Sequence, residues 1–181
     1  LFISIDEEGG KVARIANDSQ ITEPHFPSMS EIAQMPDAQD EAANVGSTIG
    51  SYLKELGFNL DFAPVADINS VDNSALGSRS YGTDAATVAP YVTSMMQGLK
   101  DQNVTSCLKH FPGMGSSTED THDGMAITGR SSEDFKTNEF TVFQAGIDAG
   151  ADMIMVGHLS APALTGDNTP CSLSSAVVTD T

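Results

Sequence analysis

Residues 104–115 read Val-Thr-Ser-Cys-Leu-Lys-His-Phe-Pro-Gly-Met-Gly and join a predicted strand to a glycine-rich loop. The apolar and β-branched run over residues 104–108 is typical of a buried strand. Pro112 and Gly113 end that run in a turn, and the residues behind them have neither helical nor strand periodicity. The ionisable side chains of this stretch and its loop include Lys109, His110, Asp120 and His122. Because functional residues are concentrated in loops that a rigid scaffold holds, this stretch is the first candidate for a functional site.

The composition is that of a globular protein. The chain has 181 residues, enough for one domain with a substantial core, and 39% of them are hydrophobic. The formal net charge is −17, with only 8 Lys and Arg residues. This balance argues against nucleic acid and anionic membrane surfaces as partners, because both require a basic face. No run of about eighteen apolar residues is present, so no membrane-spanning segment is predicted.

Two cysteines, Cys107 and Cys171, lie far apart in the sequence and form no Cys-x-x-Cys motif. This spacing favours two unpaired thiols over a disulfide or a metal site.

Strands and helices are predicted to alternate along the chain. Apolar runs predict strands at residues 1–5, 59–65, 104–108 and 151–156. Apolar residues at helical spacing predict helices at residues 41–56, 84–101 and 133–149, a short helix near residues 29–35 and the start of another behind Ser174. Gly57 follows the first long helix as its C-terminal stop. Alternation of this kind implies an α/β fold with a parallel sheet.

Each cluster of polar side chains follows a predicted strand and precedes a predicted helix. The clusters are Asp6 with Arg14, Asp67 with Arg79, residues 109–122, and His158. In a parallel sheet such positions meet at the carboxyl edge of the strands, where (β/α)8 barrels and open doubly wound sheets place their active sites. No Gly-x-Gly-x-x-Gly follows a strand and no Walker-type loop is present, so nucleotide binding through such loops is unsupported.

The chain is shorter than a complete (β/α)8 barrel, which usually needs about 250 residues. It supplies four predicted strands, begins inside a strand and stops inside a helix. We therefore expect residues 1–181 to form one partial domain that lacks about one strand–helix unit before Leu1 and about two or three after Thr181.

The side chains at the predicted sheet edge suit proton transfer and hydroxyl binding. Asp120 stands two residues before His122, so its carboxylate can fix the imidazole tautomer and make His122 a general acid/base near neutral pH. Arginine binds hydroxyls or a carboxylate in a forked manner, and Asp6 can accept two hydroxyl hydrogen bonds. Lys109 and His110 are adjacent on a strand end, so one is expected to point into the site and the other sideways or into a loop.

These pieces resemble the family 3 glycoside hydrolases, in their β-N-acetylglucosaminidase branch. The matching runs are Ile-Asp-Glu-Glu-Gly-Gly-Lys-Val-Ala-Arg at residues 5–14, Phe-Ala-Pro-Val-Ala-Asp at 62–67, Ser-Arg-Ser-Tyr-Gly at 78–82 and Lys-His-Phe-Pro-Gly at 109–113. The last run, followed by Asp120-Thr121-His122, is the most specific and separates this branch from the glucosidases of the family. The resemblance extends in order over nearly the whole chain.

The resemblance implies a (β/α)8 barrel that releases terminal β-linked N-acetylglucosamine from glycans such as peptidoglycan fragments. It implies retention of configuration through a covalent glycosyl intermediate, with His122 as acid/base and Asp120 as its partner in place of the usual carboxylic acid. It implies no metal and no organic cofactor. The residues implied to hold the sugar are Asp6, Arg14, Arg79, Lys109 and His110.

The same resemblance places the nucleophile, an Asp on a later strand, beyond the helix that begins near Ser174. Asp180 does not stand in the matching context, so this chain alone is expected to be inactive. Three other positions depart from the usual pattern of the branch, because Met114 replaces a His, Lys11 an Arg and Glu7 a Gln. The resemblance suits a bacterial protein of the cytoplasm, the cell surface or the exterior, and it leaves the oligomeric state open.

Two other function classes stay open. A metal-dependent hydrolase on the same barrel could use the ligand-type side chains His110, Asp120, His122 and His158. Against it, no strand carries a His-x-His pair, and Lys109 would place a cation beside the metal. A non-catalytic sugar-binding remnant is the third class. We interpret His158 as a satisfied polar residue at a strand end, and we leave Asp67 outside the predicted site.

Overall fold

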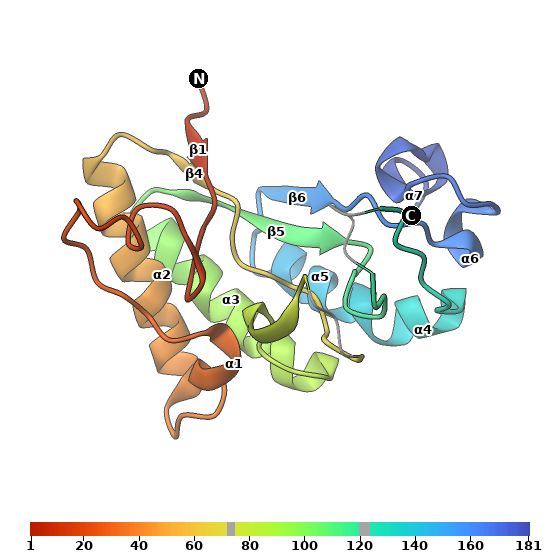
Figure 1. Ribbon diagram of the computed structural model, residues 1–181, viewed down its shortest axis with the longest axis horizontal. Coiled ribbons are helices and arrows are strands. Elements are labelled where there is room, and N and C mark those ends of the chain that lie inside the picture. Colours follow the sequence, from red (N-terminus) through yellow and green to blue (C-terminus); the bar gives the residue numbers. More distant parts are fainter. Residues whose placement is uncertain (72–74, 120–123) are drawn as a thin grey trace.

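The computed structural model describes residues 1–71, 75–119 and 124–181. Four parallel strands form one sheet in the order β1-β4-β5-β6 (Figure 1). The strands are β1 (Ser4–Ile5), β4 (Leu60–Asp61), β5 (Thr105–Phe111) and β6 (Met153–Val156). Each strand pairs with the one that follows it in this order, always in parallel. The parallel sheet predicted from the alternation of elements is therefore confirmed.

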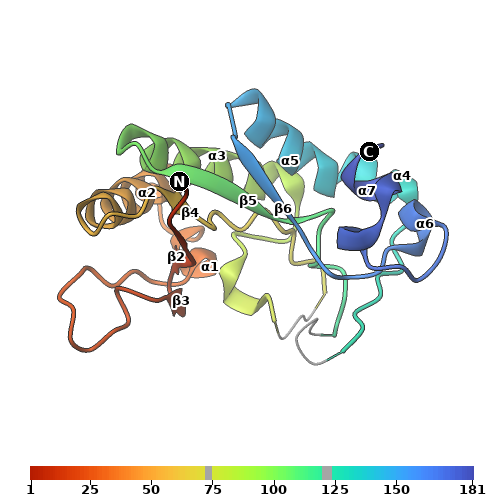
Figure 2. The same cartoon turned by 90° about the horizontal axis from the view of Figure 1, so that it is seen from above.

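Three long helices lie along one face of this sheet, and loops lie on the other (Figure 2). The helices are α2 (Ala38–Glu55), α3 (Ala85–Asp101) and α5 (Glu139–Asp148). Their apolar side chains and those of the sheet form the main core, in which Ile49, Leu53 and Leu99 are fully buried. Gly57 follows α2 with a φ of +90°, a backbone conformation that favours glycine and ends the helix as predicted.

The remaining helices are short. They are α1 (Met29–Ile32), α4 (Ser132–Thr137), α6 (Pro162–Thr165), α7 (Ser175–Val178) and the 3-10 turns η1 (Gly77–Arg79) and η2 (Cys171–Leu173). Ser174 precedes α7 as expected. Among the described residues, no helix has the length and apolar composition that crossing a membrane requires. Cys107 and Cys171 are both buried and unpaired, which confirms the interpretation of their spacing.

The single helix predicted over residues 133–149 is wrong, because the chain breaks at Asn138 into α4 and α5. Asn138 has φ −123° and ψ −82°, outside the helical region. Its side-chain amide donates to the carbonyl of Asp134 at 3.0 Å, and its own carbonyl accepts from the hydroxyl of Thr141 at 2.6 Å. Side-chain bonds of this kind compete with the helical backbone ladder and end the first helix.

A second, small sheet was not predicted. The strands β2 (Glu7–Gly9) and β3 (Val12–Ala13) form an antiparallel hairpin where the sequence suggested only a polar turn and its continuation. Gly9 and Gly10 at its tip have φ values of +88° and +56°, which a glycine adopts without steric cost. The hairpin begins directly after β1, so its charged residues lie near the carboxyl end of that strand.

Helices α2 and α3 approach so closely that a methyl group at Gly46 would not fit. A Cβ there would lie 2.1 Å from the carbonyl oxygen of Met95. Gly46→Ala is expected to lower the free energy of unfolding by about 1–3 kcal/mol, because this overlap with backbone outweighs the better helix propensity of alanine. Urea unfolding checks this, with Gly129→Ala as the control, since nothing lies within 4 Å of a Cβ at Gly129. An equal effect of the two substitutions would contradict the close approach of the helices.

Candidate active site

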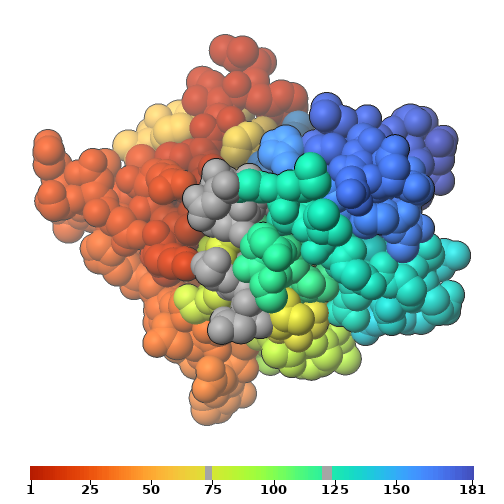
Figure 3. Space-filling view, turned by 45° about the vertical axis from the view of Figure 1, so that its right-hand side comes forward, coloured from red at the N-terminus to blue at the C-terminus, as the bar shows by residue number. Residues whose placement is uncertain are grey.

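A hollow of about 610 Å³ opens at the carboxyl edge of the sheet. The residues that line it come from the β1–β3 segment, the start of the loop after β4, η1, the end of β5 and the end of β6. All five residues implied to hold a sugar are among them: Asp6, Arg14, Arg79, Lys109 and His110. Figure 3 shows segments distant in sequence meeting on one face, with the N-terminal segment in red and the C-terminal region in blue. The structure thus brings these five side chains, which come from segments distant in sequence, to one hollow.

The floor of the hollow is a network of buried ion pairs. The Nζ atom of Lys109 lies 2.6 Å from Oδ1 of Asp6 and 2.6 Å from Oε1 of Glu8. Arg79 grips the same Glu8 in a forked manner, with Nε 2.8 Å from Oε2 and Nη2 2.7 Å from Oε1. The side chains of Lys109 and Glu8 are each 2% exposed, whereas Asp6 is 39% exposed. Asp6 therefore presents its carboxylate to the hollow, and Glu8 lies behind it.

Glu8 is the main residue that the sequence reasoning did not include in the site. Burial disfavours its charged form, but the hydrogen bonds and charges of Arg79 and Lys109 outweigh burial and hold the pKa of Glu8 below its ordinary value. Burial likewise opposes the charge of Arg79, and the pairing with Glu8 raises the pKa of that guanidinium. Both groups are therefore ionised at neutral pH, and the network holds fixed charges.

The lowered pKa of Glu8 makes a contribution to stability that depends on pH. Because the folded pKa lies below the unfolded one, this contribution is fully present above about pH 4.5 and is lost as pH falls through the folded value. We expect the difference in unfolding free energy between the wild type and Glu8→Gln to shrink steadily as pH falls from about 6 to about 3. Urea unfolding at several pH values measures it. A difference that stays constant over this range would show that Glu8 is not held ionised by its partners.

The imidazole of His110 contacts the fully buried carboxylate of Asp67. Its Nδ1 atom lies 2.7 Å from Oδ2 of Asp67, which also accepts from the backbone N–H of His110 at 3.2 Å. The other oxygen of Asp67 accepts from the backbone N–H of Met114 at 2.8 Å. Asp67 thereby fixes the orientation of the imidazole that faces the hollow. Asp67 is not part of the site predicted from the sequence. Its position directly after the second predicted strand, at the carboxyl edge of the sheet, could have indicated a role there.

Lys109 and His110 both line the hollow, so the expectation that only one of them points inward is wrong. The register between β5 and β6 shifts between Lys109 and Phe111. Such an irregularity re-aims side chains and interrupts the strict alternation on which the expectation was based. Met114, the departure from the usual His of this branch, is buried and adds an apolar wall.

Glu7 anchors the hairpin that carries Arg14. Its carboxylate is fully buried and accepts from the backbone N–H groups of Ile15 and Ala16, each at 2.9 Å, and from the hydroxyl of Tyr52 at 2.7 Å. Its backbone N–H donates to Asp61 at 2.9 Å, and burial raises the pKa of Asp61 well above its ordinary value. The Glu that replaces the usual Gln of this branch is thus fully hydrogen-bonded, and the exposed Arg14 is held beside the hollow.

His158 both lines the hollow and has a partner, since its Nδ1 atom lies 2.7 Å from the hydroxyl of Ser172. Asp120 and His122, the predicted acid/base pair, lie outside the described residues. Within residues 1–71, 75–119 and 124–181, no group of three His, Cys, Asp or Glu side chains could hold a metal ion. The metal-dependent alternative uses four ligands, and two of them, Asp120 and His122, also lie outside the described residues.

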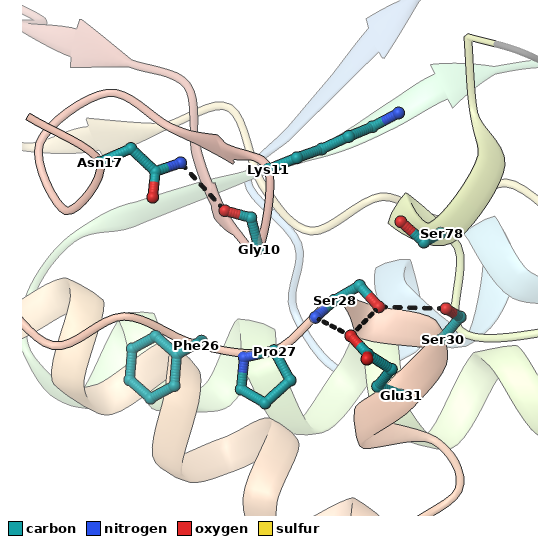
Figure 4. A pocket seen from close by; sticks show the side chains of 9 residues that line it. All are labelled: Gly10, Lys11, Asn17, Phe26, Pro27, Ser28, Ser30, Glu31 and Ser78. Carbon is teal, nitrogen blue, oxygen red and sulfur yellow. Dashed lines mark hydrogen bonds between the residues drawn. The ribbon is translucent and has the colours of Figure 1, made fainter.

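A second, shallower hollow of about 670 Å³ lies between the tip of the hairpin, the start of α1 and η1 (Figure 4). Lys11 extends over it from the hairpin, and Phe26 and Pro27 line its other side. The carboxylate of Glu31, which lines this hollow, already accepts two hydrogen bonds from Ser28: one from the backbone N–H at 2.9 Å and one from the hydroxyl at 2.6 Å. These are capping bonds of a helix start, so this hollow lacks the converging charges and imidazoles of the first.

Comparisons with known proteins agree with this geometry. Residues 1–181 match the glycosyl hydrolase family 3 N-terminal domain. The chain is 37% identical over 179 residues to the beta-hexosaminidase LpqI of Mycobacterium tuberculosis, covering 98% of this chain and 45% of that protein. It thus spans about half the length of the curated relatives that it matches.

Two solved structures show the same fold. One is a glycoside hydrolase family 3 beta-N-acetylglucosaminidase from Paenibacillus sp. str. FPU-7, with a TM-score of 0.92 and 35% identity over 98% of this chain and 33% of that one. The other is NagZ from Neisseria gonorrhoeae in complex with zinc ion, with a TM-score of 0.90 and 27% identity over 99% of this chain and 53% of that one. The chain therefore belongs to glycosyl hydrolase family 3, and the part of that family that it matches is the N-terminal domain.

Proposed function

We propose that the full-length protein is a β-N-acetylhexosaminidase. It releases terminal β-linked N-acetylglucosamine from glycans such as peptidoglycan fragments, with retention of configuration. Residues 1–181 form a partial (β/α)8 catalytic barrel domain in this proposal. The observation that carries it is the meeting of Asp6, Arg14, Arg79, Lys109 and His110 around one hollow. Family membership and the names of the relatives support the reaction class.

The side chains of the hollow suit a neutral sugar with several hydroxyl groups. Asp6 offers carboxylate oxygens as acceptors, and Lys109 and Arg79 offer N–H donors that their partners hold in place. Fixed donors and acceptors of this kind orient a substrate before the reaction, which lowers the entropic part of the barrier. In the proposal, these described residues bind and orient the sugar.

The chemical steps use groups beyond these. An Asp after Thr181 attacks the anomeric carbon and forms the glycosyl intermediate, while His122 gives its proton to the leaving oxygen. His122 then takes a proton from the water that hydrolyses the intermediate, and Asp120 supports the charged imidazole. Because the nucleophile stands outside residues 1–181, this chain alone is inactive in the proposal.

Hydrolysis of 4-nitrophenyl N-acetyl-β-glucosaminide by the full-length protein tests the proposal, with and without a chelator. We expect release of nitrophenol at an equal rate in both. The complex of Neisseria NagZ with zinc ion motivates the chelator arm, since activity lost with chelator and restored by Zn²⁺ would support the metal-dependent alternative. Binding of N-acetylglucosamine without any hydrolysis would support the sugar-binding remnant.

A further inference from the structure

The charged side chains that line the described part of the hollow, taken together with one buried carboxylate behind His110, include as many carboxylates as cations. Asp6 and Glu8 line the hollow together with three cations, Arg14, Arg79 and Lys109. A third carboxylate, Asp67, lies fully buried under His110 and contributes to the electrostatic environment of Arg79. With neutral imidazoles the formal charge of this group is therefore zero. This balance matters because charges in a partly dry hollow act on a ligand more strongly than charges in water.

Glu8 differs from Asp6 in how it can act on a ligand. Its side chain is 2% exposed, and both of its oxygens already lie within 2.8 Å of nitrogen atoms of Arg79 or Lys109. Asp6 is 39% exposed, and among the described residues its carboxylate pairs with Lys109. Asp6 can therefore bond a ligand directly, whereas Glu8 acts on a ligand through its charge and through the two cations that it holds.

Without the charge of Glu8, Lys109 and Arg79 would each lose a carboxylate partner that lies within 2.8 Å. The group of charges described above would then be net positive, and the hollow would attract an anionic sugar. With Glu8 ionised, an anionic sugar gains no net attraction and still loses its hydration on entry.

We propose that Glu8 makes the hollow select neutral sugars over anionic ones, by cancelling the charge of the two cations that it pairs with. This inference rests on the proposed function, because it takes the hollow to be the sugar site. It assigns Glu8 a role in specificity as a positioning residue, separate from the five side chains that are proposed to touch the sugar.

The test is a series of full-length variants that change the charge of the hollow in single steps. Glu8→Gln makes it more positive, Arg79→Gln more negative, and the double variant restores the balance. The quantity measured is the ratio of two dissociation constants from titration calorimetry at low salt, that of N-acetylglucosamine 6-sulfate over that of N-acetylglucosamine. Glu31→Gln, in the second hollow, is the matched control.

We expect the ratio to fall on the order of tenfold in Glu8→Gln and to rise on the order of tenfold in Arg79→Gln. It should return close to the wild-type ratio in the double variant and stay unchanged in Glu31→Gln. If Glu8 and Arg79 had only a structural role, every variant would bind both sugars more weakly by the same factor, and the ratio would not change. That result would overturn the inference. If Glu8→Gln does not fold, Arg79→Gln and the double variant still decide the matter.

Failure of the proposed function is distinguishable from failure of this inference. A wild-type protein that binds both sugars and hydrolyses no N-acetylglucosaminide contradicts the hydrolase, while the ratios still decide the role of Glu8. If the wild-type protein hydrolyses the N-acetylglucosaminide and the ratio of dissociation constants is the same in all variants, only the role of Glu8 is overturned. If neither sugar binds the wild-type protein, the hollow selects no sugar by charge and the inference is overturned.

Discussion

Replacing His122 with Ala in the full-length protein is expected to lower the turnover of 4-nitrophenyl N-acetyl-β-glucosaminide by about a hundredfold or more. A positioned acid/base contributes about 10²–10⁴-fold to such reactions, and its loss leaves the leaving oxygen to take a proton from water. The role of His122 comes from the run Lys-His-Phe-Pro-Gly and the Asp-x-His that follows it. Initial rates at saturating substrate, with circular dichroism to confirm folding, measure the effect.

A change of leaving group separates acid catalysis from a general loss of structure. Dinitrophenolate needs little protonation to depart, so kcat/KM of His122→Ala should fall much less with the 2,4-dinitrophenyl glycoside than with the 4-nitrophenyl glycoside. His25→Ala is the control, since His25 is exposed and contacts Asn17 instead of the hollow. Equal losses with the two leaving groups would remove His122 from the role of acid.

Replacing Lys109 with Met is expected to lower the free energy of unfolding by about 3 kcal/mol, the lower end of the range for breaking a buried ion pair. The lower end applies because Glu8 keeps Arg79 as a partner and Asp6 is partly exposed to water. We also expect KM to rise, because Asp6 loses the cation that holds its carboxylate toward the hollow.

Urea unfolding and steady-state kinetics of the full-length protein measure these two effects. Lys100→Met is the matched control, since Lys100 is exposed at the end of α3 and its loss should change stability by no more than about 0.5 kcal/mol. If Lys109→Met is as stable as Lys100→Met, the buried network does not hold this part of the fold together.

The elements predicted correctly are those that local patterns determine. The strand β6 is nearly all apolar, and α2 has an apolar stripe with Gly57 behind it, so nearby residues specify both. The hairpin of β2 and β3 was missed for the opposite reason. Glu7 and Glu8 look like residues of an exposed turn, and they are buried only because Tyr52 and Arg79, 45 and 71 residues further on, supply their partners.

The site shows the same division between local and distant information. The sequence placed Asp6, Arg14, Arg79, Lys109 and His110 together, because residues behind parallel strands share one edge of the sheet. It did not assign a role to Glu8 or Asp67, whose importance comes from contacts within 3 Å to cations and an imidazole far away in the sequence. The resemblance to a family supplied the reaction class, which geometry alone does not specify.

The most direct test of the central claim is a crystal structure of the full-length protein with N-acetylglucosamine bound. The account predicts the sugar in the hollow at the carboxyl edge of the sheet, with its hydroxyl groups within hydrogen-bond distance of Asp6, Arg79 and Lys109. A sugar bound elsewhere on the molecule, or one in this hollow that touches none of these three side chains, would contradict it.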